Sequence, residues 1–417
     1  MSNPILRNLL RDNPVAVTGI GSFSAAGDSV ESLWQAAVAG RSLAVEHEFQ
    51  TEKEDVADRF AVCTAPAPDI SLAELNWLRK TDRCVQMAWV ATRQAWGHAR
   101  LDGAYPAGRI GVIVGSSRGP FSKRNEVIPA TRRHRFPPSL APNTTFGSLS
   151  GALAQAFKLK GPGTTLSATC ASSAFAIALA AEQILLGKAD AMLVGGAEAP
   201  LQHAILIQLQ SAGVVASHSD AAQACRPFDA ARNGLVLGEG AGFLILESAR
   251  AAEKRGGVPL ARLAGWHASL DNTGRTGMDD GGDGLLRVME QALDTAGCTP
   301  ETIDYINAHG TGTKLNDETE AQAVAKLLGS RALKVPCSST KPITGHCLGA
   351  TSALEAVICL EALRRQVVPP TANCTHQDPL CPIHAQPLTP APAKISTVMS
   401  NSLGFWGYHA SLIFSKV

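Results

Sequence analysis

Aromatic side chains make up only 5% of this 417-residue chain and charged side chains only 18%, with a net charge of +1. So small a net charge creates no global field that would attract nucleic acid. The sequence also lacks any run of about 18 uncharged apolar residues, which a membrane-spanning helix needs. The first segment, MSNPILRNLLRDNP, places arginines and Asp12 within its short apolar run, unlike a secretory signal peptide. We therefore expect neither a nucleic-acid partner nor a membrane anchor.

Closely spaced cysteine pairs are missing as well. The ten cysteines are scattered through apolar contexts, and none forms a Cys-x-x-Cys pair. This distribution is typical of reduced thiols rather than of a disulfide framework. The sequence therefore predicts a cytoplasmic protein.

One segment, NCTHQDPLCPIH, does gather four side chains of metal-ligating types, at Cys374, His376, Cys381 and His384. Cysteine and histidine bind transition metals. The segment also contains two prolines and leads into AQPLTPAPAK, which favours a surface loop. We therefore expect no metal here, with a metal site as the alternative.

What the chain has in abundance is apolar and glycine-rich sequence, with 45% hydrophobic residues and 38 glycines. Short apolar segments alternate with helical ones. The strand-like segments include 14–23, 109–117 and 190–199, and residues 81–99 have the composition of a long helix. This alternation predicts an α/β fold.

A weak internal repeat runs through this alternation. A buried-type strand at 109–117 is followed at 164–184 by a polar strand, a small-residue turn and an apolar helix. The strand at 303–313 is followed in the same way at 337–363. We interpret this as two similar halves, residues 1–255 and 256–417, packed face to face. Chance similarity between small-residue helices is the competing interpretation.

Cys170 stands where the first apolar helix of this repeat is expected to begin. A helix N-terminus directs unpaired N–H groups and the positive end of its dipole at such a residue. That setting lowers the pKa of a thiol and makes it a nucleophile. The alternative is a buried structural cysteine, as most single cysteines are.

Two histidines lie in glycine-flanked turns, His309 in NAHGTGT and His346 in STKPITGHCLGA, which also contains Lys341. A histidine between glycines at the end of a strand faces a cleft more readily than a packed core. Each alone is as well explained by a structural role. Metal ligation is a third option, but neither histidine has the close spacing to Cys170 that a metal site usually shows.

Together these stretches resemble the elongating β-ketoacyl-[acyl carrier protein] synthases, the ketosynthases of the thiolase superfamily. The resemblance runs from VAVTGIGSFSAAG to GYHASLIF and includes CRPFDAARNGLVLGEGAGFLILE (225–247). It implies a thiolase-type fold with five α-β-α-β-α layers, a homodimer, and decarboxylative condensation of malonyl with an acyl group. It also implies an acyl carrier protein as partner, whose phosphopantetheine carries the substrates, and no other cofactor.

The resemblance assigns the catalytic roles residue by residue. Cys170 matches the thiol that accepts the acyl chain. His309 and His346 match the two histidines that act on the malonyl unit, and neutral imidazoles can donate hydrogen bonds to an enolate without a metal. Lys341 matches the lysine behind these histidines. Glu320 matches its acidic partner, so we expect an ion pair between them.

Other matches concern substrate binding and the loop near the C-terminus. Phe405 matches a phenylalanine that gates the acyl pocket, and its N–H with that of Cys170 would form an oxyanion hole. Thr311 and Thr313 match residues beside the pantetheine arm. Where relatives usually have GFGGTN this chain has GFWGYH, so we expect Trp406 to narrow the pocket mouth or to form part of the pocket floor.

Further features bear on substrate and partner. The segment 270–282 keeps Asp271 and Thr276 but has Gly274 where many relatives have histidine, and with GFWGYH this makes a specialised polyketide or polyene pathway an alternative to fatty acid synthesis. A basic segment is interpreted as a docking surface for the acidic carrier protein, with a solvated loop as the alternative. Its basic residues are Arg118, Lys123, Arg124, Arg132, Arg133 and Arg135.

Alternative functions also follow from these departures. The chain could work mainly as a subunit with a second ketosynthase-like chain, forming a heterodimer. It could instead act as a malonyl decarboxylase or an acyltransferase. The presence of Cys170, His309, Lys341 and His346 favours the condensing enzyme.

Overall fold

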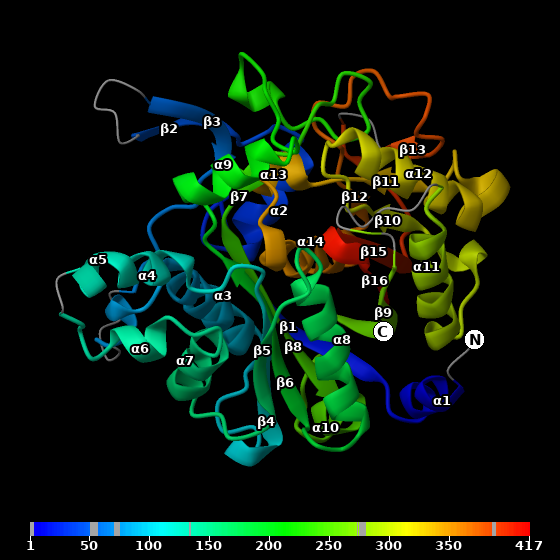
Figure 1. Cartoon of the computed structure of the whole chain (residues 1–417). Helices are drawn as coiled ribbons and strands as arrows, with labels where there is room; N and C mark the ends of the chain where they lie inside the picture. The colour runs from blue at the N-terminus through cyan, green and yellow to red at the C-terminus, as the bar shows by residue number, and fades with distance from the viewer. Residues whose placement is uncertain are drawn as a thin grey trace.

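The computed structural model describes residues 4–50, 57–70, 76–132, 135–272, 274, 281–385 and 389–417 (Figure 1). None of the helices in these ranges is both long and apolar enough to cross a membrane. The helices are α1 (Pro4–Asp12), α2 (Val30–Ala39), α3 (Arg83–Ala99), α4 (Phe121–Asn125), α5 (Val127–Arg132), α6 (Leu140–Asn143), α7 (Ser148–Phe157), α8 (Ser172–Leu185), α9 (His203–Ser211), α10 (Ala249–Lys254), α11 (Asp283–Ala296), α12 (Lys314–Leu328), α13 (Lys341–Thr344) and α14 (Thr351–Arg365).

An eleven-stranded sheet in the described part of the chain has the order β13-β11-β10-β15-β16-β9-β1-β8-β6-β4-β5. Two small sheets, β2-β3-β7 and β12-β14, lie outside it. The strands are β1 (Val15–Ser24), β2 (Val45–Gln50), β3 (Ala57–Cys63), β4 (Ile110–Gly115), β5 (Gly163–Leu166), β6 (Ala191–Glu198), β7 (Leu237–Gly238), β8 (Gly240–Ser248), β9 (Ala261–Leu270), β10 (Tyr305–Asn307), β11 (Pro336–Ser338), β12 (Val367–Val368), β13 (His384–Ala385), β14 (Ala391–Pro392), β15 (Thr397–Gly404) and β16 (Tyr408–Ser415).

The large sheet consists of two half-sheets with the same topology. In β5-β4-β6-β8-β1 the first two pairings are parallel and the last two antiparallel. The order β11-β10-β15-β16-β9 repeats this pattern. A short antiparallel ladder between β1 and β9 joins the two. The repeat predicted from the sequence is therefore present in the strand order.

Helices cover and separate these half-sheets in layers (Figure 1). Helices α3 and α7 share one apolar core with the first half-sheet, and α11 shares another with the second half-sheet and α12. A third core contains α8 and α14 together with residues of both half-sheets. This is the five-layered α-β-α-β-α arrangement expected of a thiolase-type fold. The predicted division at residue 255 falls between α10 and β9 and stays a prediction.

The composition of the central helices explains their position. Every residue of α14 from Thr351 to Leu363 is buried, and alanine occupies five of the 14 positions of α8. Helix α8 begins directly against β4, since a Cβ added at Gly115 would lie 2.4 Å from the backbone of Ser172. Glycine at this position therefore lets the start of the helix approach the sheet.

Candidate active site

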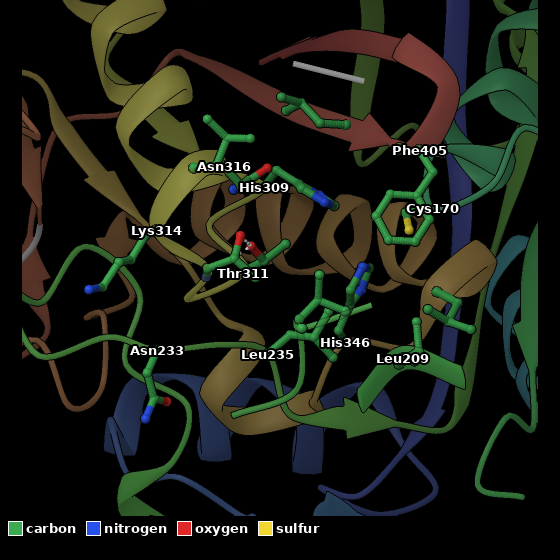
Figure 2. Close-up of a pocket in the computed structure, with 17 residues that line it drawn as sticks. Cys170, Leu209, Asn233, Leu235, His309, Thr311, Lys314, Asn316, His346 and Phe405 are labelled. Carbon is green, nitrogen blue, oxygen red and sulfur yellow. Dashed lines mark hydrogen bonds between the residues drawn. The ribbon is translucent and has the colours of Figure 1, made fainter. Parts of the chain in front are cut away.

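A cavity of about 490 Å³ is lined by both halves of the chain (Figure 2). Cys170 comes from the first half, and His309 and His346 come from the second. The structure thus brings these three predicted residues to one place, although they are far apart in sequence. The rest of the lining consists of Leu209, Gly213, Val214, Asn233, Leu235, Thr311, Thr313, Lys314, Leu315, Asn316, Leu348, Leu403, Gly404 and Phe405.

Cys170 lies in the turn between β5 and α8, directly before Ala171, the N-cap of the helix. The preceding Thr169 has a φ of 51°, a left-handed conformation that is uncommon for a residue other than glycine. Its hydroxyl donates to the carbonyl of Phe405 at 3.3 Å. A Cβ at Gly404 would lie 2.1 Å from that hydroxyl oxygen, so only glycine lets β15 approach the Cys170 turn.

The thiol itself is not the thiolate that its position suggested. Burial raises the pKa of Cys170 to about 11. The charge of Lys341 and a hydrogen bond from the N–H of Phe405 to the sulfur oppose this rise without cancelling it. The expectation of a helix-activated thiolate is therefore wrong, because desolvation outweighs the stabilising charges. A nearby base must remove this proton before the sulfur can attack.

His309 follows β10 and is held from both sides. Its backbone N–H and that of Gly310 each donate to Glu320, at 2.8 Å. Its Nδ1 lies 3.3 Å from Nζ of Lys341, whose ammonium donates hydrogen bonds and accepts none. Burial and the charge of Lys341 lower the pKa of His309 well below its ordinary value. A neutral His309 accepts at Nδ1 and so carries its proton on Nε2.

His346 is held less specifically. Its Nδ1 lies 3.1 Å from the hydroxyl of Thr351, and a hydroxyl can donate or accept. Burial and Lys341 lower the pKa of His346 well below its ordinary value, so this imidazole is neutral as well. The two rings meet edge to face with centroids 5.3 Å apart. The site therefore contains one imidazole with a fixed Nε2 proton and a second whose tautomer can change.

Lys341 is fully buried, and its ion pair differs from the predicted one. Its ammonium lies 2.7 Å from Oε1 of Glu355 on α14 and also donates to the carbonyl of His309. Glu320 instead accepts the two backbone N–H groups described above. The predicted pairing of Lys341 with Glu320 is therefore wrong. The signal for Glu355 was a carboxylate within the apolar run TSALEAVICLEAL, where only a buried cation would compensate it.

Glu198 is a second residue that the sequence analysis missed. It ends β6, is fully buried, and accepts hydrogen bonds from the N–H groups of Ser117, Arg118 and Gly349 at 2.6, 2.9 and 3.1 Å. Burial raises its pKa to about 7 against these bonds. Glu198 thereby ties the loop after β4 to the segment that precedes α14.

The predicted pantetheine residues lie toward the other end of the cavity. Thr311 and Thr313 share a hydroxyl contact of 2.9 Å. Lys314 and Leu315 are exposed residues of the cavity lining, so this end is the mouth. Figure 2 shows Lys314 and Asn233 on the side of the cavity opposite Cys170 and Phe405. The path from solvent to Cys170 thus passes Thr311 and the two histidines.

Phe405 lines the cavity next to Cys170, as predicted, but Trp406 does not line it. The Trp406 side chain is 58% exposed, and its backbone is left-handed, with φ 66° and ψ 19°. The turn is also held by Asp271, whose N–H donates to the carbonyl of Gly407 at 2.7 Å. The prediction that Trp406 narrows or floors the pocket is therefore wrong, because the left-handed backbone turns its side chain outward.

The remaining sequence candidates do not add to this site. Among the described residues no cluster of three or more histidine, cysteine or acidic side chains could hold a metal ion. Cys381 donates instead to the carbonyl of Asp317. In the basic segment, Arg124 lies over the rings of Phe121 and Phe146. Arg133, Thr276 and the start of the segment after 385 lie outside the described residues, whereas Gly274 is described.

Both halves of the chain match domains of one protein family. Residues 12–252 match the N-terminal domain of β-ketoacyl synthases, and residues 260–375 match the C-terminal domain. The chain belongs to the β-ketoacyl synthase family. A relative from Coxiella burnetii (strain RSA 493 / Nine Mile phase I), 3-oxoacyl-[acyl-carrier-protein] synthase 2, is 35% identical over 97% of this chain and 98% of its own.

Further relatives have different names. Nodulation protein E of Rhizobium sp. (strain N33) is 34% identical over 97% of this chain and all of its own. A type II polyketide ketosynthase solved with its acyl-carrier protein superposes with a TM-score of 0.87 and 28% identity, covering 97% of this chain and 100% of its own. The ishigamide ketosynthase/chain length factor also gives 0.87, at 31% identity over 97% and 99% of the two chains. As a member of the β-ketoacyl synthase family this protein is a condensing acyltransferase with a thiolase-type fold.

The buried ion pair leads to the first prediction. Replacing Glu355 by Gln leaves the ammonium of Lys341 buried without a counter-charge, which costs about 3–5 kcal/mol when a buried pair is broken. Replacing Glu320 by Gln keeps an oxygen for one of the two N–H groups and should cost about 1–3 kcal/mol. Urea denaturation of both variants measures these differences. A larger loss for Glu320→Gln than for Glu355→Gln would contradict the pairing.

The second prediction concerns the left-handed Trp406. This conformation costs a non-glycine residue roughly 1–2 kcal/mol, a cost that disappears when the turn opens and the residue leaves that region. Trp406→Gly removes this cost and so stabilises the turn, in which Phe405 lies next to Cys170. Labelling of Cys170 by a bulky maleimide should therefore slow about 5–30-fold. Trp406→Ala removes the indole but keeps the backbone cost, so it should label like the wild type. Equal effects of both variants would show that the indole, not the backbone, matters.

Proposed function

We propose that this protein is a 3-oxoacyl-[acyl carrier protein] synthase that condenses malonyl-carrier protein with an acyl group held on Cys170. One observation carries this proposal. A single cavity presents a thiol beside two neutral imidazoles, one of which has its Nε2 proton fixed by a buried lysine. A thiol accepts an acyl group, and imidazole N–H groups stabilise an enolate. Supporting this, the family match spans both halves of the chain.

In the loading half-reaction, we infer that His346 takes the thiol proton of Cys170, since its tautomer can change. The sulfur attacks the acyl thioester and a new S–C bond forms, while the C–S bond to the carrier breaks and the carrier leaves as a thiol with the proton from His346. The N–H of Phe405, which already points at the sulfur, would bind the oxyanion together with that of Cys170. No metal or other cofactor is needed in this scheme, because the phosphopantetheine arm carries both substrates.

In the condensing half-reaction, the bond between the malonyl carboxylate and its neighbouring carbon breaks and CO₂ leaves. The electron pair of that bond stays with the thioester, which becomes an enolate. The Nε2–H of His309 is placed to donate to the enolate oxygen, and Lys341 keeps that proton on Nε2. The enolate carbon then attacks the acyl carbonyl, forming the C–C bond and releasing the sulfur of Cys170. Lys341 is held by Glu355 and by the Nδ1 and the carbonyl of His309. It therefore acts by positioning His309 and not as a nucleophile.

We propose the acyl carrier protein as partner and a homodimer as assembly, with a heterodimer as the alternative. A ketosynthase from Xenorhabdus doucetiae in complex with its chain length factor superposes with a TM-score of 0.82 at 28% identity, covering 100% of both chains, so related chains form such pairs. Strand β5 ends the large sheet as a partly exposed edge, which another chain can extend. The ten free cysteines fit a reduced cytoplasmic location.

A docking surface for the carrier protein is the remaining part of this proposal. Carrier proteins are acidic, and the described residues that follow β4 include the cations Arg118, Lys123, Arg124, Arg132 and Arg135. In that segment Lys123 already pairs with Glu126 at 2.7 Å.

Sedimentation of the purified chain, with and without a ketosynthase-like partner, tests the assembly. A chain that is a stable homodimer and condenses alone would contradict the heterodimer.

The third prediction tests the nucleophile. Cys170→Ala should abolish both acyl loading and condensation, because Cys170 is the one cysteine among the described residues that line the cavity. The intact mass of the protein after incubation with an acyl carrier thioester measures the loading. Acyl mass on the Ala variant would show that the acyl group is held elsewhere. Decarboxylation of malonyl thioester should continue in a Cys170→Gln variant, since both histidines remain.

The fourth prediction separates the two histidines. His309→Ala removes an enolate donor, which costs about 10²–10³ in rate, and should leave loading of Cys170 nearly unchanged. His346→Ala removes the proposed base for the thiol and should slow both half-reactions. Single-turnover loading and condensation are measured separately on each variant. Equal losses in both half-reactions for His309→Ala would point to a folding role instead.

A further inference from the structure

One residue of the cavity wall has a backbone conformation that leucine rarely adopts. Leu348 has a φ of 43°, in the left-handed region that favours glycine. Its side chain is buried, lines the cavity and belongs to the same apolar cluster as Cys170. A bulky residue with a positive φ is an outlier that persists only where its surroundings impose it. The residues on either side of Leu348 must therefore be held in place.

The chain before Leu348 is fixed by backbone hydrogen bonds. The N–H of His346 donates to the carbonyl of Val236 at 2.7 Å, and the carbonyl of His346 accepts from the N–H of Gly238 at 3.1 Å. These bonds hold the histidine next to β7, but they do not decide the direction in which the chain continues. The left-handed turn at Leu348 must therefore be fixed from its other side.

The chain after Leu348 is fixed by a side chain from the other half of the protein. The N–H of Gly349 donates to Oε2 of Glu198 at 3.1 Å. A Cβ at Gly349 would lie 2.3 Å from the nitrogen of Ser117, so the backbone of this turn lies directly against the loop after β4. Glu198 therefore anchors the residue that follows Leu348.

The carboxylate of Glu198 joins two segments of the chain. It is fully buried and accepts four hydrogen bonds, from the N–H groups of Gly349, Ser117 and Arg118 and from the hydroxyl of Ser116. A buried carboxylate is costly unless its oxygens are hydrogen-bonded. Because its donors belong to the loop after β4 and to the left-handed turn, the carboxylate is stable only while both segments stay in place.

The wall that Leu348 forms lies beside the nucleophile. The chain that continues from the left-handed turn bonds twice to the segment around Cys170. The hydroxyl of Ser352 donates to the carbonyl of Cys170 at 3.4 Å, and the N–H of Ala353 donates to the hydroxyl of Ser173 at 2.9 Å. A close-packed apolar wall discriminates by volume. An extra methyl group on an acyl chain near the sulfur would therefore compete with the Leu348 side chain for space.

We propose that Glu198 is a positioning residue, which keeps Leu348 left-handed so that its side chain closes the cavity wall beside Cys170 against branched acyl chains. The inference rests on the proposed function, in which the acyl chain is held on Cys170. When the carboxylate is replaced by a weaker acceptor, Gly349 is released, and Leu348 returns to the right-handed region that leucine prefers. Its side chain then leaves the wall, and the space beside the sulfur widens.

The experiment measures the preference between two acyl pantetheine thioesters with the same number of carbons, hexanoyl and 2-methylpentanoyl. The rate of transfer to Cys170 is followed by intact mass, and the preference is the ratio of the two kcat/KM values. Glu198→Gln offers one neutral oxygen where the carboxylate offers two charged ones, so it weakens the hold on Gly349. Leu348→Ala removes the wall side chain itself, and a double variant combines the two changes.

Asp82→Asn is the matched control. Asp82 is likewise a buried carboxylate, and it accepts the N–H groups of Cys84 and Lys123 and the hydroxyl of Ser122. These donors belong to α3 and α4 and not to the turn at Leu348. The control therefore shows what a weakened carboxylate near the loop after β4 does while that turn stays anchored.

Glu198→Gln and Leu348→Ala should each lower the preference for the hexanoyl chain by about 10–200-fold, which is what one methylene group is worth in an apolar pocket. The double variant should lose no more than Leu348→Ala, since no side chain is left for Glu198 to place. Asp82→Asn should keep the wild-type preference. Where Glu198→Gln does not fold, Gly349→Ala replaces it, because its Cβ would lie 2.8 Å from Oε2 of Glu198 and push the N–H away from the carboxylate.

A wild type that loads both chains equally, or an unchanged preference in Glu198→Gln, would overturn the proposal. Losses that multiply in the double variant would overturn it too, since Glu198 would then act by a route other than Leu348. The same holds for an equal loss in Asp82→Asn. A wild type that transfers neither acyl group, although thiol titration finds Cys170 accessible, would reject the proposed function itself.

Discussion

The buried ammonium of Lys341 is the interaction on which the rest of the site depends. It is completely shielded from water, so its charge is compensated by Glu355 and by the carbonyl and Nδ1 of His309. The same charge lowers the pKa of both histidines and opposes the rise in the pKa of Cys170. Burial is the larger cause of the low pKa of both imidazoles, and this one cation adds to it, selects the tautomer of His309 and opposes the rise in the pKa of the Cys170 thiol. A solvated lysine would do none of this, because water would screen its field.

Neither half of the chain contains a complete site. The N-terminal half supplies Cys170 on the turn before α8, and the C-terminal half supplies His309, Lys341 and His346 around the start of α14. Helices α8 and α14 share one core between the half-sheets, so the turns before them face each other. Close backbone contacts at Gly115 and Gly404 allow this approach. Duplication of one topology therefore creates a pocket at the pseudo-symmetry axis that a single copy could not enclose.

Much of this was predictable from the sequence, for identifiable reasons. Cys170, His309 and His346 stand in small-residue and glycine-flanked turns that interrupt apolar strands and helices, which made them candidates, and the resemblance to ketosynthases assigned their roles. The partner of Lys341 was not predictable in that way, because Glu320 and Glu355 lie on different helices and only the packed structure decides which one reaches the ammonium. The pKa of Cys170 required the same knowledge, since burial outweighs the helix start. For Trp406, the sequence indicated a bulky side chain near the pocket. The backbone dihedral angles of Trp406 decide that this side chain points away from the pocket.

The high pKa of the Cys170 thiol also fits the order of the chemistry. A thiol that stays protonated in the resting site is protected from casual electrophiles, and it reacts when a base and an oxyanion hole act together. Both lie in the cavity: a neutral His346 can take the proton, and the N–H of Phe405 already points at the sulfur. Desolvation, which weakens the nucleophile at rest, strengthens every hydrogen bond that acts on the developing charge.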